Sequence, residues 1–367
     1  IPSYVLANIS TSIIDPLYLG CTVIPEPIYD KEYFPYGIIL NEPNMSGGSV
    51  SFWRNLCMKF LNSEIFKKRS LPYLFLPIVT GEAMSSGEEK FFNKMARKHK
   101  FGVGKLPWPL APVTFSIGGG TNEITGIFVT LFRRFQEKYL GFGKKVGQTP
   151  LACADVEVVN KNGKPVDVGE FGEIIVRTEC GMKGYRYDSD LNKSVMFKRN
   201  GEDWYRMSAY GVKLDNLPHI QIKGRLKDHI IIKDDEGNLV EYPLFLIDDI
   251  VAADTKNILS SSVIKTEVGG DEVIVIHIEP QVDAVIKDKD KLMQSICSRL
   301  EGKIPTYLTK RIFIRFRSND ESFPIDPSGK RSIRRLQEEK LYRAKSFYDI
   351  KYHEMFMAKT LSMKEKK

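Results

Sequence analysis

The stretch WYRMSAYGVKLDNLPHIQIKGRLKDHIII, residues 204–232, decides the fold of this chain. It predicts two short strands, WYRMSAYGVKLD and HIQIKGR, joined by a turn at Asn216–Pro218 and followed by a third apolar strand. Between the second and third strands lies a cluster of one glycine and alternating charges: Gly224, Arg225, Lys227 and Asp228. Such a cluster can turn without burying backbone, as a hinge between two domains requires, although composition alone favours an ordinary hairpin.

Size and charge set the outer bounds. The 367 residues are 42% hydrophobic and 27% charged, enough for a sizeable core in two or three domains. The net charge of +8 is concentrated at the C-terminus, where residues 329–367 hold 12 Lys and Arg against 5 Asp and Glu. The remainder is almost neutral, so a nucleic-acid-binding protein is the least favoured class, with the basic tail as its one candidate contact.

The cysteines and histidines do not form a metal-binding pattern. Five cysteines are widely spaced without CxxC: Cys21, Cys57, Cys153, Cys180 and Cys297. We expect them to be reduced, partly buried thiols of a cytoplasmic protein. The five histidines form no HxH or HExxH group, and no apolar run approaches the ~18 residues of a membrane span.

Texture along the chain predicts an α/β architecture. Leu74–Val79 predicts a buried parallel strand, and Ser85 or Ser86 is the expected cap of the charged helix that follows. Residues 43–61 predict a loop and then an amphipathic helix, whose aromatic face fits the core better than a substrate pocket. From Val146 the pattern changes to a β-meander, and an α+β unit follows the GRLKD cluster.

Two segments carry side chains suited to phosphate chemistry. GGGTNE, residues 118–123, combines a glycine run with the carboxylate of Glu123, which could hold Mg²⁺, although the residues alone favour a tight turn. Lys330 lies on the loop PIDPSGKRS, where its charge suits a phosphoryl or carboxylate oxygen, although a solvated lysine is the simpler interpretation.

Together and in order, these pieces resemble the adenylate-forming superfamily, which includes acyl-CoA synthetases, luciferases and peptide-synthetase adenylation domains. GRLKD resembles the family's hinge signature, and GGGTNE resembles its GYGxTE motif. Further matches run along most of the chain: IPSYVLAN, PNMSGGSVSFW, IVTGEAMS, GEFGEIIVR with MKGY, DWYRMSAYG and PIDPSGKRSIRRL. The resemblance implies an α/β part of the large domain at 1–145 and a β-rich subdomain at 146–226. A mobile α+β domain at 227–340 and a basic helical tail at 341–367 would follow.

The resemblance also implies a reaction and a set of roles. Family members activate a carboxylic acid with Mg·ATP as an acyl-adenylate, and then transfer the acyl group to a thiol, often coenzyme A, with loss of AMP. Glu123 and Lys330 would be catalytic, with Glu123 linked to Mg²⁺ and Lys330 between the acid and the α-phosphate. Lys227 would be the hinge about which the small domain swings. Nucleotide-binding positions would be Gly118, Gly119, Gly120, Thr121, Asn122, Tyr205 and Arg225, and acyl-pocket positions Tyr4, Val5, Trp53 and Gly81.

Departures from the family pattern leave two functions open. The aromatic residue that stacks on adenine falls at Gly119, and the aspartate that binds the ribose falls at Ala209. The chain begins at Ile1, as a fragment would, and no SSGTTGxPK-like phosphate loop occurs in it. We therefore expect the 367 residues alone to catalyse little or no adenylation. The parent protein is either an acid–thiol ligase, using coenzyme A or a carrier-protein thiol, or a degenerate member that acts as a binding or scaffold subunit.

Overall fold

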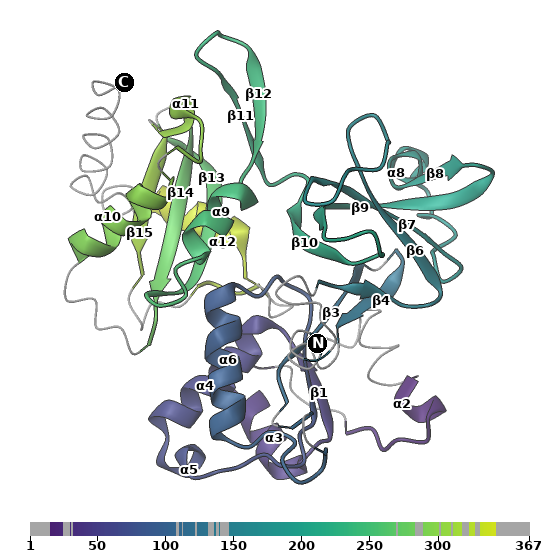
Figure 1. The fold of residues 1–367 in the computed structure, drawn as a ribbon, viewed down its shortest axis with the longest axis vertical. Helices are drawn as coiled ribbons and strands as arrows, with labels where there is room; N and C mark the ends of the chain where they lie inside the picture. Colours follow the sequence, from purple (N-terminus) through teal and green to yellow (C-terminus); the bar gives the residue numbers. More distant parts are fainter. Residues whose placement is uncertain are drawn as a thin grey trace. The chain divides into compact units, whose positions relative to one another are not determined.

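The computed structural model divides the chain into two compact units (Figure 1). Unit 1 comprises Ile1–Met84, Phe92–Leu226 and Pro327–Lys330, and unit 2 comprises Ser85–Phe91, Lys227–Asp326 and Arg331–Lys367. The residues that the structure describes are 15–24, 30, 32–107, 110–111, 113–121, 123–130, 136, 139, 147–268, 271–282, 289–300, 302–309, 311–317, 323–326 and 331–342.

The first sheet of unit 1 has the order β1-β2-β3-β4-β5. Its strands are β1 (Met45–Gly48), β2 (Leu76–Val79), β3 (Ser116–Thr121), β4 (Thr125–Thr130) and β5 (Thr149–Pro150). The first three strands are parallel, and β4 and β5 pair antiparallel. Because the carboxyl ends of parallel strands meet at one edge, the residues after β2 and within β3 lie close together.

Four short or medium helices accompany this sheet: α2 (Asp15–Tyr18), α3 (Phe34–Asn41), α4 (Val50–Asn62) and α5 (Glu64–Lys67). The aromatic face of α4 is buried, as expected from its spacing. The segment before α4, expected to be a loop, instead forms β1 in parallel pairing with β2. Its sequence MSGG lacks β-branched residues, so pairing with β2 overrides a weak local propensity.

Helix α6 (Ser86–Lys98) begins with a capping box. The hydroxyl of Ser85 accepts from the Glu88 N–H at 3.2 Å, while the Glu88 carboxylate accepts from the Ser85 N–H at 2.9 Å. This reciprocal pair satisfies two backbone donors at the helix start. The sequence expectation that Ser85 or Ser86 caps this helix is thereby confirmed for Ser85.

The second sheet of unit 1 is the predicted β-meander. It has the order β10-β9-β7-β6, with β8 paired to β9. Its elements are β6 (Ala154–Val159), β7 (Phe171–Thr178), α8 (Ser189–Val195), β8 (Met196–Arg199), β9 (Glu202–Lys213) and β10 (Ile220–Arg225). Strands β9 and β10 confirm the two strands and the turn predicted at the start of the decisive stretch.

Unit 2 is an α+β fold. A hairpin of β11 (His229–Lys233) and β12 (Leu239–Pro243) leads into a three-stranded sheet of order β13-β14-β15. Its other elements are α9 (Phe245–Ala252), β13 (Ile258–Val268), β14 (Asp271–Pro280), α10 (Lys289–Leu300), α11 (Thr306–Thr309), β15 (Ile312–Phe316) and α12 (Ile333–Tyr342). Of the predicted tail at 341–367, only the first two residues are described, and they end α12.

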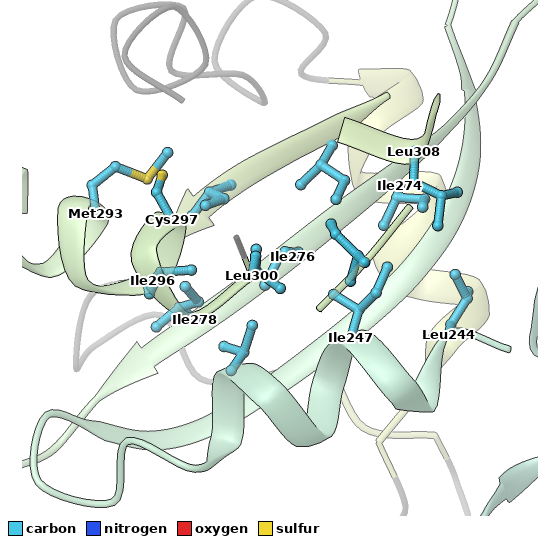
Figure 2. Close-up of a cluster of buried hydrophobic side chains, with 14 of the residues drawn as sticks. Leu244, Ile247, Ile274, Ile276, Ile278, Met293, Ile296, Cys297, Leu300 and Leu308 are labelled. Carbon is cyan, nitrogen blue, oxygen red and sulfur yellow. The ribbon is translucent and has the colours of Figure 1, made fainter. Parts of the chain in front are cut away.

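Strand β14 explains why unit 2 forms a compact core. Ile274, Ile276 and Ile278 point to one face, where they meet side chains of α9 and α10 (Figure 2). Val273 and Val275 point to the other face and pack with Phe323 and Leu336. Because successive strand residues alternate between faces, this continuous apolar run is what a sheet covered on both sides requires.

None of the helices in the described ranges is long and apolar enough to cross a membrane.

Candidate functional site

The glycine run belongs to a strand. Gly118 and Gly119 lie in β3 and pair with Val129 and Phe128 of β4. Strand β3 ends at Thr121, and the described backbone turns at Glu123 and Ile124; Asn122 lies outside the described residues. The tight turn expected for this segment therefore lies after the glycines and not at them, because β4 pairs antiparallel with β3 and keeps Gly118 and Gly119 extended.

Glycine at position 119 leaves space that a neighbouring strand fills. A Cβ there would lie 3.3 Å from Cδ1 of Ile222 and 3.6 Å from Cβ of Phe128. Ile222, from β10, therefore packs over the position where the family pattern has an aromatic ring. Gly118 lies beside the end of β2, since its Cβ position is 3.4 Å from Cγ2 of Ile78 and 3.8 Å from the Thr80 hydroxyl.

Two side chains hold the carboxylate of Glu123, one from the end of β3 and one from a segment far along the chain. The Tyr185 hydroxyl donates to the Glu123 carboxylate, and the Thr121 side chain also hydrogen-bonds to it. Burial acts to raise the pKa of Glu123, but these two hydrogen bonds and a third from the Glu123 backbone outweigh it, and the net pKa lies below the ordinary value. Burial and the neighbouring Glu123 raise the pKa of Tyr185 to about 12. Glu123 is therefore a carboxylate and Tyr185 a neutral donor at neutral pH.

The segment Gly181–Tyr185 connects this carboxylate to β9. The Met182 N–H donates to the Glu123 carbonyl at 2.7 Å, and the Met182 carbonyl accepts from the Tyr205 hydroxyl at 3.0 Å. A Cβ at Gly181 would lie 2.3 Å from the Tyr205 hydroxyl, so only glycine fits beside this ring. Tyr205 is itself only 5% exposed and lies in the meander core, where it positions Met182.

The segment Met207–Ala209 of β9 keeps an unusual backbone. Ser208 has φ of +51°, in the left-handed region, at the position where the family motif has glycine. Its carbonyl accepts from the Leu226 N–H at 2.9 Å, and Ala209 is the direct ladder partner of Arg225. The family's ribose-binding carboxylate would therefore lie beside Arg225, and here that position offers a methyl group.

Of the two predicted functional lysines, the structure describes Lys227 but not Lys330. Lys227 is exposed in the turn between β10 and β11, at the point where the long segments of units 1 and 2 meet. Lys330 lies outside the described residues. The residue after it, Arg331, is anchored within unit 2, donating to the Ser261 carbonyl at 2.6 Å, the Ser260 hydroxyl at 2.7 Å and Glu88 at 3.2 Å.

The structure describes two of the four predicted acyl-pocket residues, Trp53 and Gly81. Tyr4 and Val5 lie outside the described residues. Gly81 lies in the turn after β2 with φ of +88°, a conformation that favours glycine. Trp53 is fully buried, donates from Nε1 to the Ile78 carbonyl at 2.8 Å and packs edge-on against Phe115. Its surroundings support the core interpretation of α4 and give its pocket role no support.

The donor set tests the cofactors that the resemblance implies. Within the described residues, no group of three or more His, Cys, Asp or Glu side chains could hold a metal ion. A single charged carboxylate at Glu123 still fits Mg²⁺, which commonly binds through one or two carboxylates with water and phosphate oxygens. Adenosine fits less well, because position 209 has no acceptor for the ribose and position 119 has no ring for the base.

Tyr185 is a residue of the candidate site that the sequence analysis did not predict, although it ends the MKGY motif. Its contact with Glu123 joins residues that are 62 positions apart. The signal that could have found it is the tyrosine at the end of that motif.

Comparisons with known proteins point to one fold. No protein-family model matches the chain. A D-alanine–D-alanyl carrier protein ligase of Bacillus licheniformis is 26% identical over 187 residues, which are 50% of this chain and 34% of that protein. This chain thus spans about a third of the curated relative that it matches.

Solved structures cover far more of the chain. The anthranilate CoA ligase AuaEII in complex with anthranoyl-AMP superposes with a TM-score of 0.64 at 16% identity, over 92% of this chain and 57% of that one. An ATP-bound RpMatB-BxBclM chimera gives 0.66 at 16% identity, over 93% and 59%. A benzoate CoA ligase from Burkholderia xenovorans LB400 gives 0.62 at 14% identity, over 88% and 57%. The motifs and these superpositions agree, and the chain has the fold of the adenylate-forming ligases.

Proposed function

We propose that this chain is part of an acid–thiol ligase, which activates a carboxylic acid as an acyl-adenylate and transfers the acyl group to a thiol. The observation that carries the proposal is Glu123, a carboxylate kept charged by Tyr185 and Thr121 in a fold shared with CoA ligases. A carboxylate fixed in this way is charged at neutral pH, as a cation-binding role requires.

Each retained residue has a role in this proposal. Mg·ATP, when bound, would supply the phosphoryl centre that the substrate carboxylate attacks. Glu123 would hold the magnesium ion, and Arg225, exposed at the end of β10, would contact the ribose. Lys227 would be the hinge residue, and the boundary along the chain between Leu226 of unit 1 and Lys227 of unit 2 supports this role. Lys330 would neutralise charge between the acid and the phosphate.

The relatives leave the acid and the acceptor thiol open. Their names give anthranilate and benzoate with coenzyme A, and D-alanine with a carrier protein. We accordingly propose a small carboxylic acid as substrate, with coenzyme A or a carrier-protein thiol as acceptor.

A second candidate, a binding or scaffold subunit without catalysis, is favoured by one specific observation. The ribose position beside Arg225 is Ala209, and Ile222 packs over Gly119 where adenine would stack. Loss of a charge-assisted acceptor weakens nucleotide binding by on the order of 2 kcal/mol, which disfavours a catalytic site.

Binding of an acyl-adenylate mimic separates the two candidates. The probe is benzoyl sulfamoyl-adenosine, titrated calorimetrically against the 367-residue chain with and without Mg²⁺. The ligase proposal predicts binding to the wild type, and Mg²⁺-dependent binding of ATP that Glu123→Gln weakens. Absence of binding by both ligands would overturn the proposal in favour of the scaffold subunit. Exchange of pyrophosphate into ATP, run beside it with several carboxylic acids, is expected to be weak for this chain alone.

A further inference from the structure

Two exposed cysteines lie together at one end of the meander. Cys153 is one residue before β6 and Cys180 is two residues after β7, just beyond the last ladder pair, Ala154 with Thr178. Both side chains are exposed, and the two thiols are within hydrogen-bond reach of each other. The expectation of partly buried cysteines is therefore wrong for three of the five, since Cys21 is exposed as well.

The surroundings favour contact between these thiols. The Cys180 N–H donates to the Thr178 hydroxyl at 3.1 Å in the turn that follows β7. The thiol of Cys153 hydrogen-bonds to the Cys180 thiol and to the side chain of Thr178. Continued one step past Ala154 and Thr178, the ladder would place Cys153 opposite Glu179, so Cys180 lies one residue beyond the position that faces Cys153. The two cysteines are thus diagonal neighbours just past the last pair, where both contact Thr178.

We propose that Cys153 and Cys180 form a reversible disulfide that tethers the segment holding Glu123. Only Gly181 separates Cys180 from Met182, whose N–H donates to the Glu123 carbonyl. Tyr185, at the other end of the same segment, donates to the Glu123 carboxylate. A covalent link at Cys180 would thus restrict the start of the segment that supports the candidate magnesium ligand.

The chemistry needs an oxidant, and a low-molecular-weight disulfide such as oxidised glutathione supplies it. One cysteine thiolate attacks a sulfur of the oxidant and releases one glutathione thiolate, which takes up a proton. The second cysteine, also deprotonated, then displaces the bound glutathione. In balance, two thiols lose two protons and two electrons, and one glutathione disulfide becomes two glutathiones. Burial and the neighbouring Cys180 raise the pKa of Cys153, so the reaction should accelerate as pH rises.

The test counts thiols in the full chain, and its readout is independent of any ligase activity. After equilibration with oxidised glutathione and alkylation of the unfolded chain, Cys153 and Cys180 should both be protected from alkylation without carrying glutathione, and mapping should find one peptide cross-linked through them. Cys180→Ser and Cys153→Ser should instead carry one glutathione on the remaining partner. Cys21→Ser, which removes an exposed cysteine elsewhere, should cross-link as the wild type does. Separate glutathione adducts on both wild-type cysteines, without a cross-link, would overturn the disulfide.

Amide hydrogen exchange tests the tether itself. Oxidation should slow exchange at Met182 in the wild type, dithiothreitol should restore it, and Cys180→Ser should show neither change. A cross-linked protein with unchanged exchange at Met182 would overturn the link to Glu123. Both variants replace exposed side chains, so they should fold normally.

Discussion

The turn at Glu123 and the segment Met207–Ala209 of β9 both match motifs of the adenylate-forming family. The turn has the motif's acidic side chain, whereas the segment of β9 has only a backbone conformation that suits the motif's glycine. At the turn, the acidic side chain is present and is supported by Tyr185, Thr121 and Met182. In β9, the position that matches the family's ribose-binding aspartate is Ala209, and Ser208 beside it has a left-handed backbone. Backbone geometry is maintained by the surrounding hydrogen bonds and packing, whereas the chemistry depends on single side chains that can be lost separately.

The support beneath the turn gives the largest expected effect. Gly181→Ala would place a Cβ 2.3 Å from the Tyr205 hydroxyl, so the buried ring or the segment must move. We expect a loss of roughly 3 kcal/mol in the free energy of unfolding, measured by urea denaturation, since overpacking is joined by a lost hydrogen bond.

Gly47→Ala is the matched control. Gly47 has no positive φ, and its Cβ position has no atom within 4 Å, so this change should be nearly neutral. Equal stability of the two variants would show that the segment is not clamped between Tyr205 and Glu123.

Restoring the missing acceptor tests the other side of the comparison. Ala209→Asp places a carboxylate beside Arg225, its ladder partner, and should tighten AMP binding by about 2 kcal/mol, roughly thirtyfold in Kd. Calorimetric titration with AMP measures this. Ala209→Asn, similar in size but uncharged, should give a smaller gain. An unchanged Kd in the aspartate variant would mean that the backbone of β9 no longer presents position 209 to the ribose.

Removing the donor to Glu123 has a smaller effect that depends on pH. Tyr185→Phe should cost about 1 kcal/mol of unfolding free energy at pH 7, because it deletes a charge-assisted hydrogen bond between partly exposed groups. The lowered pKa of Glu123 means that its stabilisation is present above its ordinary value of 4.5 and is lost as pH falls through the folded value. The difference between wild type and variant should therefore shrink below pH 4.5.

The alkaline limb provides the internal check. Because the pKa of Tyr185 is raised to about 12, its contribution is complete below the ordinary value of 10.0 and is lost as pH rises through 12. Urea denaturation across this range should show both losses in the wild type alone. A difference that stays constant from acid to alkaline pH would contradict the Tyr185–Glu123 bond.

Local patterns in the sequence predicted strands and caps well. The alternation in residues 204–225 predicted β9, β10 and their turn, and Ser85 with Glu88 marked the start of α6. Strand β1 could not be predicted from MSGG, because its pairing with β2 comes from residues some thirty positions away. The motifs of the family indicated the fold, since matches in the right order are hard to obtain by chance.

The supports of the candidate site were beyond sequence reasoning for a different reason. Tyr185 with Glu123, and Cys153 with Cys180, are brought together only when the meander pairs β6 with β7 and returns to the first sheet. Serine itself does not indicate the positive φ of residue 208, because it is common in strands and turns alike, and only the glycine of the matching family motif points to it. The positions of these residues along the chain do not indicate that Tyr185 contacts Glu123 or that Cys153 contacts Cys180.

The smallest effect is a gain in stability at Ser208. Left-handed backbone costs a residue with a Cβ roughly 1 kcal/mol, so Ser208→Gly should raise the free energy of unfolding by somewhat less, after the extra entropy of glycine in the unfolded chain is deducted. Ser208→Ala keeps the Cβ and should change little, since the serine side chain is exposed. Thermal or urea denaturation of the three proteins measures the series. A gain in stability with glycine alone would show that β9 holds residue 208 in a left-handed conformation that serine disfavours. Equal stability of the glycine and alanine variants would mean that the strain is absent. The backbone of this segment would then differ from the family pattern, as its side chains do.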